Sequence, residues 1–443
     1  MVWGTSTTTS AWGPQPAPLD PLLSQIRSGR TRTLVLFSSQ RVRADDWPRL
    51  FDALADAERS GHGVTSISMS GQTVPVDAYS ALETYLSVAS SLTELACLPR
   101  DATDAELGPW ARGFSSLSIS ALAKLDLSGK ALGTEPTESK SQLATLLEAV
   151  EASLTSLSLA GTAPMLPASL APPTGALTNL HTLDLSDCDL SPSALRAWIA
   201  AVGSLALRTL RLSGNPGLFP TDSSSSDEEE LGSVLATYAP NLTSLTLSET
   251  PIPTGTALAS VLAACPHLKT LDVSGAVADV LEFSPVEVRE ALTSLTLTGA
   301  GFTSVNAGAV MVAFPNLSHL DLSECRAGGA SVAVVAAILG HGGSLRSLAL
   351  RGVSLVGIVA AAAAEGAWER AGVTSLDLTA TGLDLAELTA LVTLLPTVTL
   401  WEVGANPCCD DVDGMMELTR TTAPRCEIVW RMMGQGDEGQ EDE

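Results

Sequence analysis

Residues that could do chemistry are few in this chain and widely scattered. The five histidines have neither H-E-x-x-H spacing nor the Cys/His spacing of a metal site: His62, His181, His267, His319 and His341. Cys408 and Cys409 are adjacent rather than separated as C-x-x-C. Gly129-Lys130 lacks the flanking residues of a phosphate-binding loop, and no G-x-S-x-G elbow occurs. The sequence therefore predicts no metal, no cofactor and no enzymatic activity.

One pair of residues has a spacing that an acid and a base could use. His319 and Asp321 are two positions apart, so on a strand both would point to the same face. No nucleophile and no pocket accompany them in the sequence. The pattern therefore favours a polar surface pair on a strand over a catalytic pair.

A repeated pattern predicts the strand that carries this pair. The stretch "NLTSLTLSET" (241–250) returns as "ALTSLTLTGA" (291–300), and Leu242, Leu245 and Leu247 follow the spacing L-x-x-L-x-L. The last two leucines alternate with polar residues, as on a strand with one buried face. Copies of this spacing recur every 24 to 35 residues along almost the whole chain. Such a period is typical of stacked supersecondary units.

The segments between these strands have the period of a helix. Leu195, Trp198, Ile199 and Val202 lie at i, i+3, i+4 and i+7, which makes one apolar helical stripe. Ser191-Pro192 has the form of an N-cap followed by a first-turn proline. Asp384 and Glu387 have the spacing of a capping box. Each unit is therefore predicted to be a strand, a loop and a helix.

With these repeats, residues 31 to 430 resemble the leucine-rich repeat family, in particular its ribonuclease-inhibitor-like class. The family places Asn or Cys after the strand, matched here by Cys188, Asn215, Cys325 and Asn406, whereas other copies carry Thr250, Ala276, Ala300, Val353 or Thr381. The resemblance implies an α/β fold: a right-handed, curved solenoid with parallel strands on its concave face and helices on its convex face.

Polar and acidic stretches set the predicted domain boundaries. Residues 1–20 are expected to be disordered, 21–430 to form the solenoid with its caps, and 431–443 to form an acidic disordered tail. The polar run 221–230 lies in the longest repeat and is expected to form a loop. Three serines in it precede acidic residues by three positions, as at sites preferred by acidophilic kinases: Ser224, Ser225 and Ser226.

The predicted binding surface is the outward face of the strands. The residue between the last two leucines of each copy points outward, and six of eleven such residues are carboxylates. Together with the neighbouring histidine, the candidate binding residues are Asp126, Asp184, Arg211, Asp272, His319, Asp321, Asp377 and Glu402. This face would attract a basic protein partner. The formal net charge of −25 argues against nucleic acid as a ligand.

We therefore expect a noncatalytic protein-interaction scaffold. The resemblance leaves two alternatives open: a regulator of a small GTPase, like the activating proteins of the nuclear-transport GTPase, and a substrate receptor of a ubiquitin ligase. The sequence has no apolar run of membrane-spanning length and no basic, apolar leader. Seven scattered cysteines, an odd number, indicate reduced thiols and an intracellular, cytoplasmic location. The oligomeric state stays open.

Overall fold

The structure is a computed structural model of the chain. It describes residues 19–36, 42–70, 72–98, 107–117, 121–129, 142–162, 171, 176–202, 206–219, 231–252, 255–275, 289–299, 304–325, 334–335, 337–339, 343–357, 359, 372–423 and 425–430. Residues 1–18 of the predicted N-terminal segment, the predicted loop 221–230 with Ser224, Ser225 and Ser226, and the predicted tail 431–443 lie outside this set.

The chain divides into two compact units, Met1–Leu242 and Thr243–Glu443. The strands of the first unit are β1 (Thr33–Val35), β2 (Ser66–Ser70), β3 (Glu94–Leu98), β4 (Lys124–Asp126), β5 (Ser156–Ser158), β6 (Thr182–Asp184) and β7 (Thr209–Arg211). Its helices are α1 (Leu19–Arg27), α2 (Trp47–Arg59), α3 (Tyr79–Leu86), α4 (Gly108–Ser115), α5 (Gln142–Val150), α6 (Pro192–Val202) and α7 (Leu231–Tyr238), with short 3-10 turns η1 (Ala44–Asp46), η2 (Val76–Ala78) and η5 (Pro216–Leu218). Each strand from β1 to β6 pairs in parallel with the strand that follows it.

The second unit repeats the same plan. Its strands are β8 (Ser244–Thr246), β9 (Thr270–Asp272), β10 (Ser294–Thr296), β11 (His319–Asp321), β12 (Ser347–Ala349), β13 (Ser375–Asp377), β14 (Leu400–Glu402) and β15 (Glu427–Val429). Its helices are α8 (Gly255–Ala264), α9 (Ser304–Ala313), α12 (Leu385–Leu394) and α13 (Val412–Thr422), with a 3-10 turn η8 (Pro407–Asp410). Again the neighbouring strands run parallel in sequence order.

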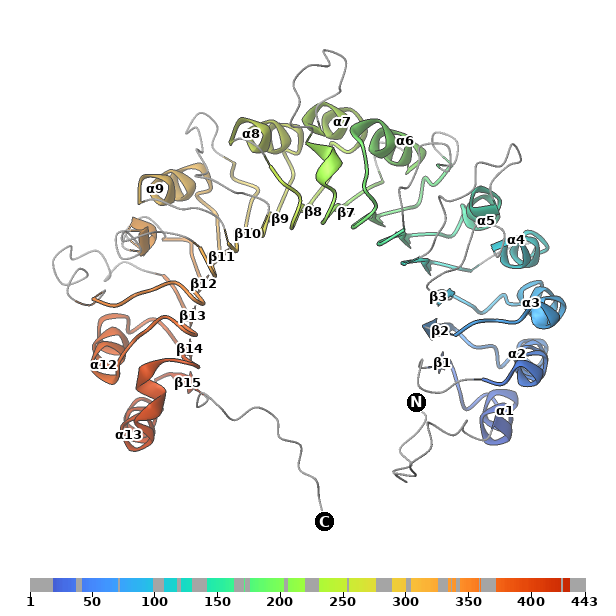
Figure 1. Cartoon of the computed structure of the whole chain (residues 1–443), viewed down its shortest axis with the longest axis horizontal. Helices are drawn as coiled ribbons and strands as arrows, with labels where there is room; N and C mark the ends of the chain where they lie inside the picture. Colours follow the sequence, from blue (N-terminus) through green and yellow to red (C-terminus); the bar gives the residue numbers. More distant parts are fainter. Residues whose placement is uncertain are drawn as a thin grey trace. The chain divides into compact units, whose positions relative to one another are not determined.

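Within each unit the strands lie on the inner side and the helices on the outer side (Figure 1). The predicted solenoid of parallel strands and helices is therefore confirmed. One of its expected boundaries falls elsewhere. Helix α1 begins at Leu19, inside the segment expected to be disordered. Strand β15 carries no copy of the leucine pattern that the sequence search used, because Arg425 stands where the preceding copy has Val398.

The core consists of the leucines of the repeated pattern and the apolar stripes of the helices. Leu245 is fully buried, and Leu295 is 1 % exposed. Trp198 and Ile199 of α6 are fully buried, as the helical spacing predicts. A strand of three residues buries too little apolar surface to be stable alone, so each repeat depends on its neighbours.

The threonine of the recurring sequence "LTSL" joins successive repeats through a hydrogen bond of its hydroxyl. Thr293 Oγ1 donates to the carbonyl of Lys269 (3.2 Å), and Thr93 Oγ1 donates to the carbonyl of Thr65 (2.9 Å). The same carbonyls also accept two backbone N–H groups of the next repeat. Equivalent hydroxyl bonds are made by Thr65, Thr155, Ser318, Thr374 and Thr399. The repeated threonine or serine at the start of these strands therefore hydrogen-bonds the previous repeat.

The two predicted helix caps form, one of them only in half. Ser191 Oγ accepts the N–H of Ala194 at 3.2 Å, which caps α6. Asp384 Oδ1 accepts the N–H of Glu387 at 2.7 Å at the start of α12. The reciprocal bond of a capping box is replaced, because Glu387 Oε1 accepts the N–H of Gly357 in the previous repeat at 2.7 Å.

The residues that match the family's Asn/Cys position hold the turn after the strand. Asn215 Nδ2 donates to the carbonyls of Leu185 and Leu212, both at 2.9 Å. Cys188 and Cys325 act similarly but with a single thiol, which donates to a carbonyl of the previous repeat. These side chains satisfy buried backbone groups that would otherwise lack a partner.

Candidate protein-binding face of the sheet

The strand register brings the predicted row of outward residues together within each unit. In the first unit Asp126 pairs with Ser158, which pairs with Asp184, and Asp184 pairs with Arg211. In the second unit the register joins, strand by strand, Asp272, Thr296, Asp321, Ala349, Asp377 and Glu402. One residue from each strand therefore contributes to the row.

His319 lies outside this row. It begins β11, two positions before Asp321, and pairs in register with Ser294 and Ser347. Its ring is exposed, and Nδ1 lies 2.8 Å from the hydroxyl of Ser318. That arrangement corresponds to the polar surface residue which the sequence favoured over an acid–base pair.

The aspartates of the row have a local role that the sequence interpretation missed. In each case Oδ1 accepts the backbone N–H two residues later, at 2.8 to 3.1 Å, as in an Asx turn. The donors, in chain order from Asp126 to Asp377, are Ser128, Ser186, Ser274, Ser323 and Thr379. The recurring sequence Asp-Leu-Ser could have revealed this role. The hydrogen bond fixes the carboxylate at the point where the chain leaves the strand.

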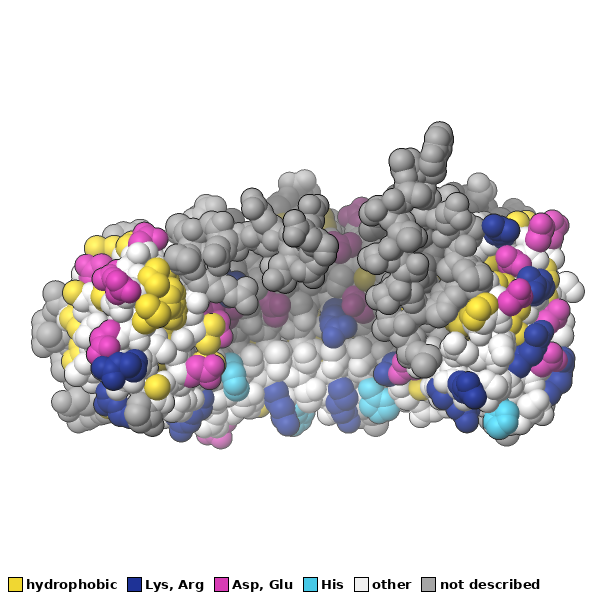
Figure 2. Space-filling model, turned by 90° about the horizontal axis from the view of Figure 1, so that it is seen from below, with side chains coloured by type: hydrophobic (Ala, Val, Ile, Leu, Met, Phe, Trp, Pro, Cys, Tyr) yellow, Lys and Arg dark blue, Asp and Glu magenta, His cyan; other side chains and the backbone are white. Residues whose placement is uncertain are grey.

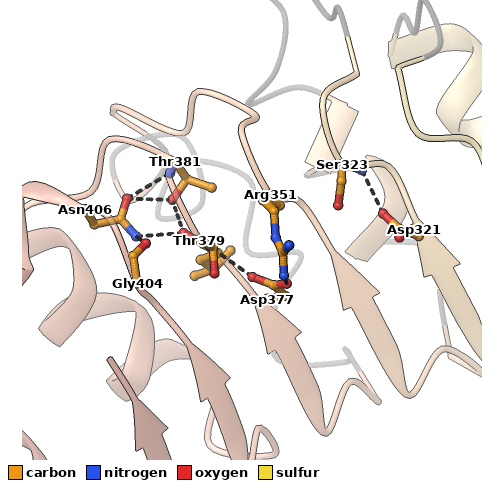
Figure 3. A network of polar contacts seen from close by, with 9 residues as sticks. Asp321, Ser323, Arg351, Asp377, Thr379, Thr381, Gly404 and Asn406 are labelled. Atoms are coloured by element: carbon orange, nitrogen blue, oxygen red, sulfur yellow. Dashed lines mark hydrogen bonds and ion pairs between the residues drawn. The ribbon is translucent and has the colours of Figure 1, made fainter. Parts of the chain in front are cut away.

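Arginines neutralise part of the row, and one of them was not among the predicted residues. Arg351 follows β12, where the row residue is Ala349, and its Nη2 lies 3.0 Å from Asp377 Oδ2 (Figure 3). The hydrogen bond to Asp377 raises the pKa of Arg351, and the charges of Glu402 and Asp321 raise it further. A guanidinium thus already occupies the gap that the alanine leaves in the row.

The two units differ in charge balance on this face. A shallow hollow on the first unit is lined by β2 to β7, and its charges are largely paired: Lys124 lies 2.5 Å from Glu94, and Arg211 lies 3.6 Å from Asp184. The row of the second unit has four carboxylates and the single guanidinium of Arg351. Among the described residues, neither Asp272 nor Asp321 has a cationic partner. The row of the second unit therefore keeps the larger net negative charge.

A second set of carboxylates follows the row on the turn, and sequence reasoning missed it as well. Asp187, Glu249 and Glu324 have φ between 55° and 59°, in the left-handed region where glycine is usual. Glu324 covers Gly352 of the next repeat so closely that a Cβ there would lie 2.4 Å from its Oε1. The strand-exit side of the sheet is thus more acidic than the predicted row alone.

Cys188, Cys265 and Cys408 are buried thiols that form no disulfide and have little capacity for chemistry. Burial raises the pKa of Cys188 to about 11 and that of Cys265 to about 12. Burial and the neighbouring Cys409 raise the pKa of Cys408 to about 12. Because the thiolate is the reactive form, these thiols are unreactive at neutral pH. Across the described ranges no three His, Cys, Asp or Glu side chains gather to hold a metal ion.

The repeated strand-turn-helix units, their buried leucines and the Asn/Cys positions after the strands define the class: the chain has the fold of leucine-rich repeat proteins. A family model described as leucine-rich repeat matches residues 176–197, which include β6 and the first half of α6. No curated protein matches the chain. In the part that the structure describes, no helix is both long and apolar enough to cross a membrane.

Two solved structures are similar to this chain over most of its length. An internalin from Listeria monocytogenes str. 4b F2365 has 15 % sequence identity and a TM-score of 0.46, with 95 % of this chain and 99 % of the internalin chain covered. A chain of the yeast Rad7 and Elc1 complex has 15 % identity and a TM-score of 0.45, with 88 % of this chain and 89 % of the other covered.

Proposed function

We propose that this protein is a noncatalytic interaction scaffold of the ribonuclease-inhibitor-like class, and that the sheet face of its second unit binds a basic segment of a partner protein. The observation that carries the proposal is the fixed geometry of the row: Oδ1 of each aspartate is held by a backbone N–H, while Oδ2 of Asp272 and Asp321 has no cationic partner among the described residues. A carboxylate already held in place loses little side-chain entropy when it binds a cation.

The pair of Arg351 and Asp377 supports the chemistry of such a partner. It shows that a guanidinium fits beside a row carboxylate whose other oxygen is already bonded to the turn. The neighbouring outward positions carry small polar residues, such as Ser294 and Ser375, which leave room for long side chains. Arginines or lysines of a partner would therefore take similar positions beside Asp272 and Asp321, with an affinity that falls as salt rises.

A variant with three neutral row residues tests this proposal. Replacing Asp272, Asp321 and Asp377 by Asn removes three charges and keeps the Oδ1 acceptor for each turn. A fluorescent oligo-lysine peptide should then bind roughly tenfold more weakly at low ionic strength. The matched control carries Glu290→Gln, Asp410→Asn and Asp413→Asn, the same charge change at exposed positions away from the row. Equal weakening by both triple variants would contradict a specific role for the row.

The location proposed with this function is intracellular and cytoplasmic. Its support is that the buried thiols Cys188, Cys265, Cys408 and Cys409 form no disulfide, although the sulfur atoms of the last two are only 3.9 Å apart. An oxidising compartment usually selects paired cysteines instead.

A further inference from the structure

The cations of the second unit fall into two groups that differ in their partners. Six Lys and Arg residues of this unit are described. Arg351 pairs with Asp377, and Arg420 pairs with Glu417 at 2.7 Å. The other four stand at the side of the sheet where the strands begin: Lys269, Arg289, Arg346 and Arg425. Of these, Lys269, Arg346 and Arg425 make no ion pair with any described carboxylate.

These four cations, with His319, form what we call the basic rim. Lys269 directly precedes β9, Arg346 directly precedes β12, and Arg425 stands two residues before β15. Lys269, Arg346, Arg425 and His319 are exposed. Figure 2 shows Lys, Arg and His side chains along the lower edge of the pale strand face, with most acidic side chains above them. Among the described residues, the carboxylates on this side of the sheet are those of Glu290 and Glu427, so the cations of the basic rim outnumber them.

This rim is unexpected for the composition of the chain. Asp and Glu number 49 against 24 Lys and Arg, so a cation on an average surface position would find a carboxylate nearby. Arg346 instead donates Nη1 to the carbonyls of Gly343, Leu345 and Gly372, at 3.0 to 3.2 Å. These neutral acceptors hold the guanidinium in place and leave its charge without a counter-charge among the described residues. Together with Lys269 and Arg425, it makes a line of cations without a carboxylate partner among the described residues, and such a line attracts an anionic ligand.

We propose that the basic rim binds an extended acidic segment of a partner polypeptide. The four strands β9 to β12 place Lys269, His319 and Arg346 along a line about 14 Å long, because neighbouring strands are about 4.8 Å apart. An extended peptide of four or five residues has about this length. Glutamate or aspartate side chains along it would face Lys269 at one end and Arg346 at the other, with His319 between them.

The geometry favours a peptide over a nucleic acid. Lys269 directly precedes β9 and Asp272 ends it, so their Cα atoms are about 10 Å apart at the usual rise per residue, slightly more than the Debye length of about 8 Å at physiological salt. A single acidic peptide can lie on the basic rim and avoid the strongest repulsion from the outward row of carboxylates, which we call the acidic row. A duplex has one negative charge per about 1.7 Å of its axis on both strands, so it would bring phosphates over the row as well.

The experiment measures the binding of a fluorescent oligo-glutamate peptide to the full chain by anisotropy. The variant Lys269→Gln with Arg346→Gln should weaken binding roughly tenfold at low ionic strength. Arg59→Gln with Arg420→Gln changes the net charge equally, at two exposed cations that pair with Asp56 and Glu417 away from both the rim and the row, and should leave binding nearly unchanged. The triple change of Asp272, Asp321 and Asp377 to Asn should preserve or strengthen this binding, so the basic rim and the acidic row can fail independently.

Thermal melting of each variant is the control that it is still folded. If the loss of the Arg346 hydrogen bonds lowers stability, Arg346→Lys keeps the charge, and Lys269→Gln with Arg425→Gln removes two charges without touching those bonds. Three outcomes would overturn the proposal: no binding of the peptide to the parent at low ionic strength, equal weakening by the rim and control variants, or tighter binding of an oligonucleotide of the same charge.

Discussion

Asn406 joins two neighbouring repeats through Thr381, whose backbone N–H its Oδ1 accepts at 2.8 Å (Figure 3). The same oxygen accepts the N–H of Gly382, while Nδ2 donates to the carbonyls of Leu378 and Val403 at 2.7 and 2.9 Å. Asn406 is 2 % exposed, so water cannot replace these bonds. One side chain thus satisfies backbone groups on both sides of a repeat boundary.

Replacing Asn406 by Ala should therefore destabilise the protein strongly. Several buried N–H and C=O groups would lose their partner together, and we expect a cost of roughly 3 to 5 kcal/mol. Urea unfolding measures this cost. Asn316→Ala is the control, because Asn316 is exposed and its amide makes one bond, to the carbonyl of Glu290, so about 1 kcal/mol is expected there. Similar costs for the two variants would contradict the bridging role of Asn406.

The leucines of the strands should behave as core residues. Leu295→Ala and Leu320→Ala each remove a side chain that is at most 2 % exposed. Lost burial and the remaining cavity should cost roughly 2 to 5 kcal/mol. The free energy of unfolding from denaturant titration is the measurement, and an unchanged transition would show that these positions are not in the core.

The sequence predicted this part of the fold because a leucine on a half-buried strand is visible as a period of two. Strand β15 was missed because Arg425 and Glu427 stand where the pattern has an apolar and a small polar residue, although Ile428 still pairs with Trp401. Register, and hence the row of carboxylates, followed from the alignment of the copies. The position of Arg351 did not, because its contact depends on how a long side chain crosses from one repeat to the next.

The turn after each strand gives a test of backbone strain. Ala405 has φ of 56°, where an alanine costs more than a glycine, whereas Gly299 has φ of 77° at an equivalent turn and open space around its Cα. Ala405→Gly should stabilise the protein by about 0.5 kcal/mol, and Gly299→Ala should destabilise it by about 1 kcal/mol. Because a Cβ at Gly299 would meet no atom, its effect reports the backbone alone. Opposite signs for the two changes in melting temperature are the expected result.

Buried thiols should make the protein sensitive to alkaline pH. Burial raises the pKa of Cys265 from 9.0 to about 12, so the folded state keeps its proton where the unfolded state has lost it. Its stabilising contribution is fully present below about pH 9 and is lost as pH rises towards 12. The free energy of unfolding of Cys265→Ala should therefore fall less steeply than that of the parent across this window. Parallel slopes would show that other groups cause the alkaline loss.

Different residues along each strand serve the core, the bonds between repeats and the outward face, so the binding surface can change without disturbing the fold. In β10 the central Leu295 packs inward, while the side chain of Thr296 contributes to the outward row. Thr293, directly before the strand, bonds the previous repeat through its hydroxyl. A mutation at Thr296 would thus change the one side chain that this repeat contributes to the row and leave the bonds between repeats intact. A lineage could rewrite the partner preference of such a surface one repeat at a time, with each intermediate still folded.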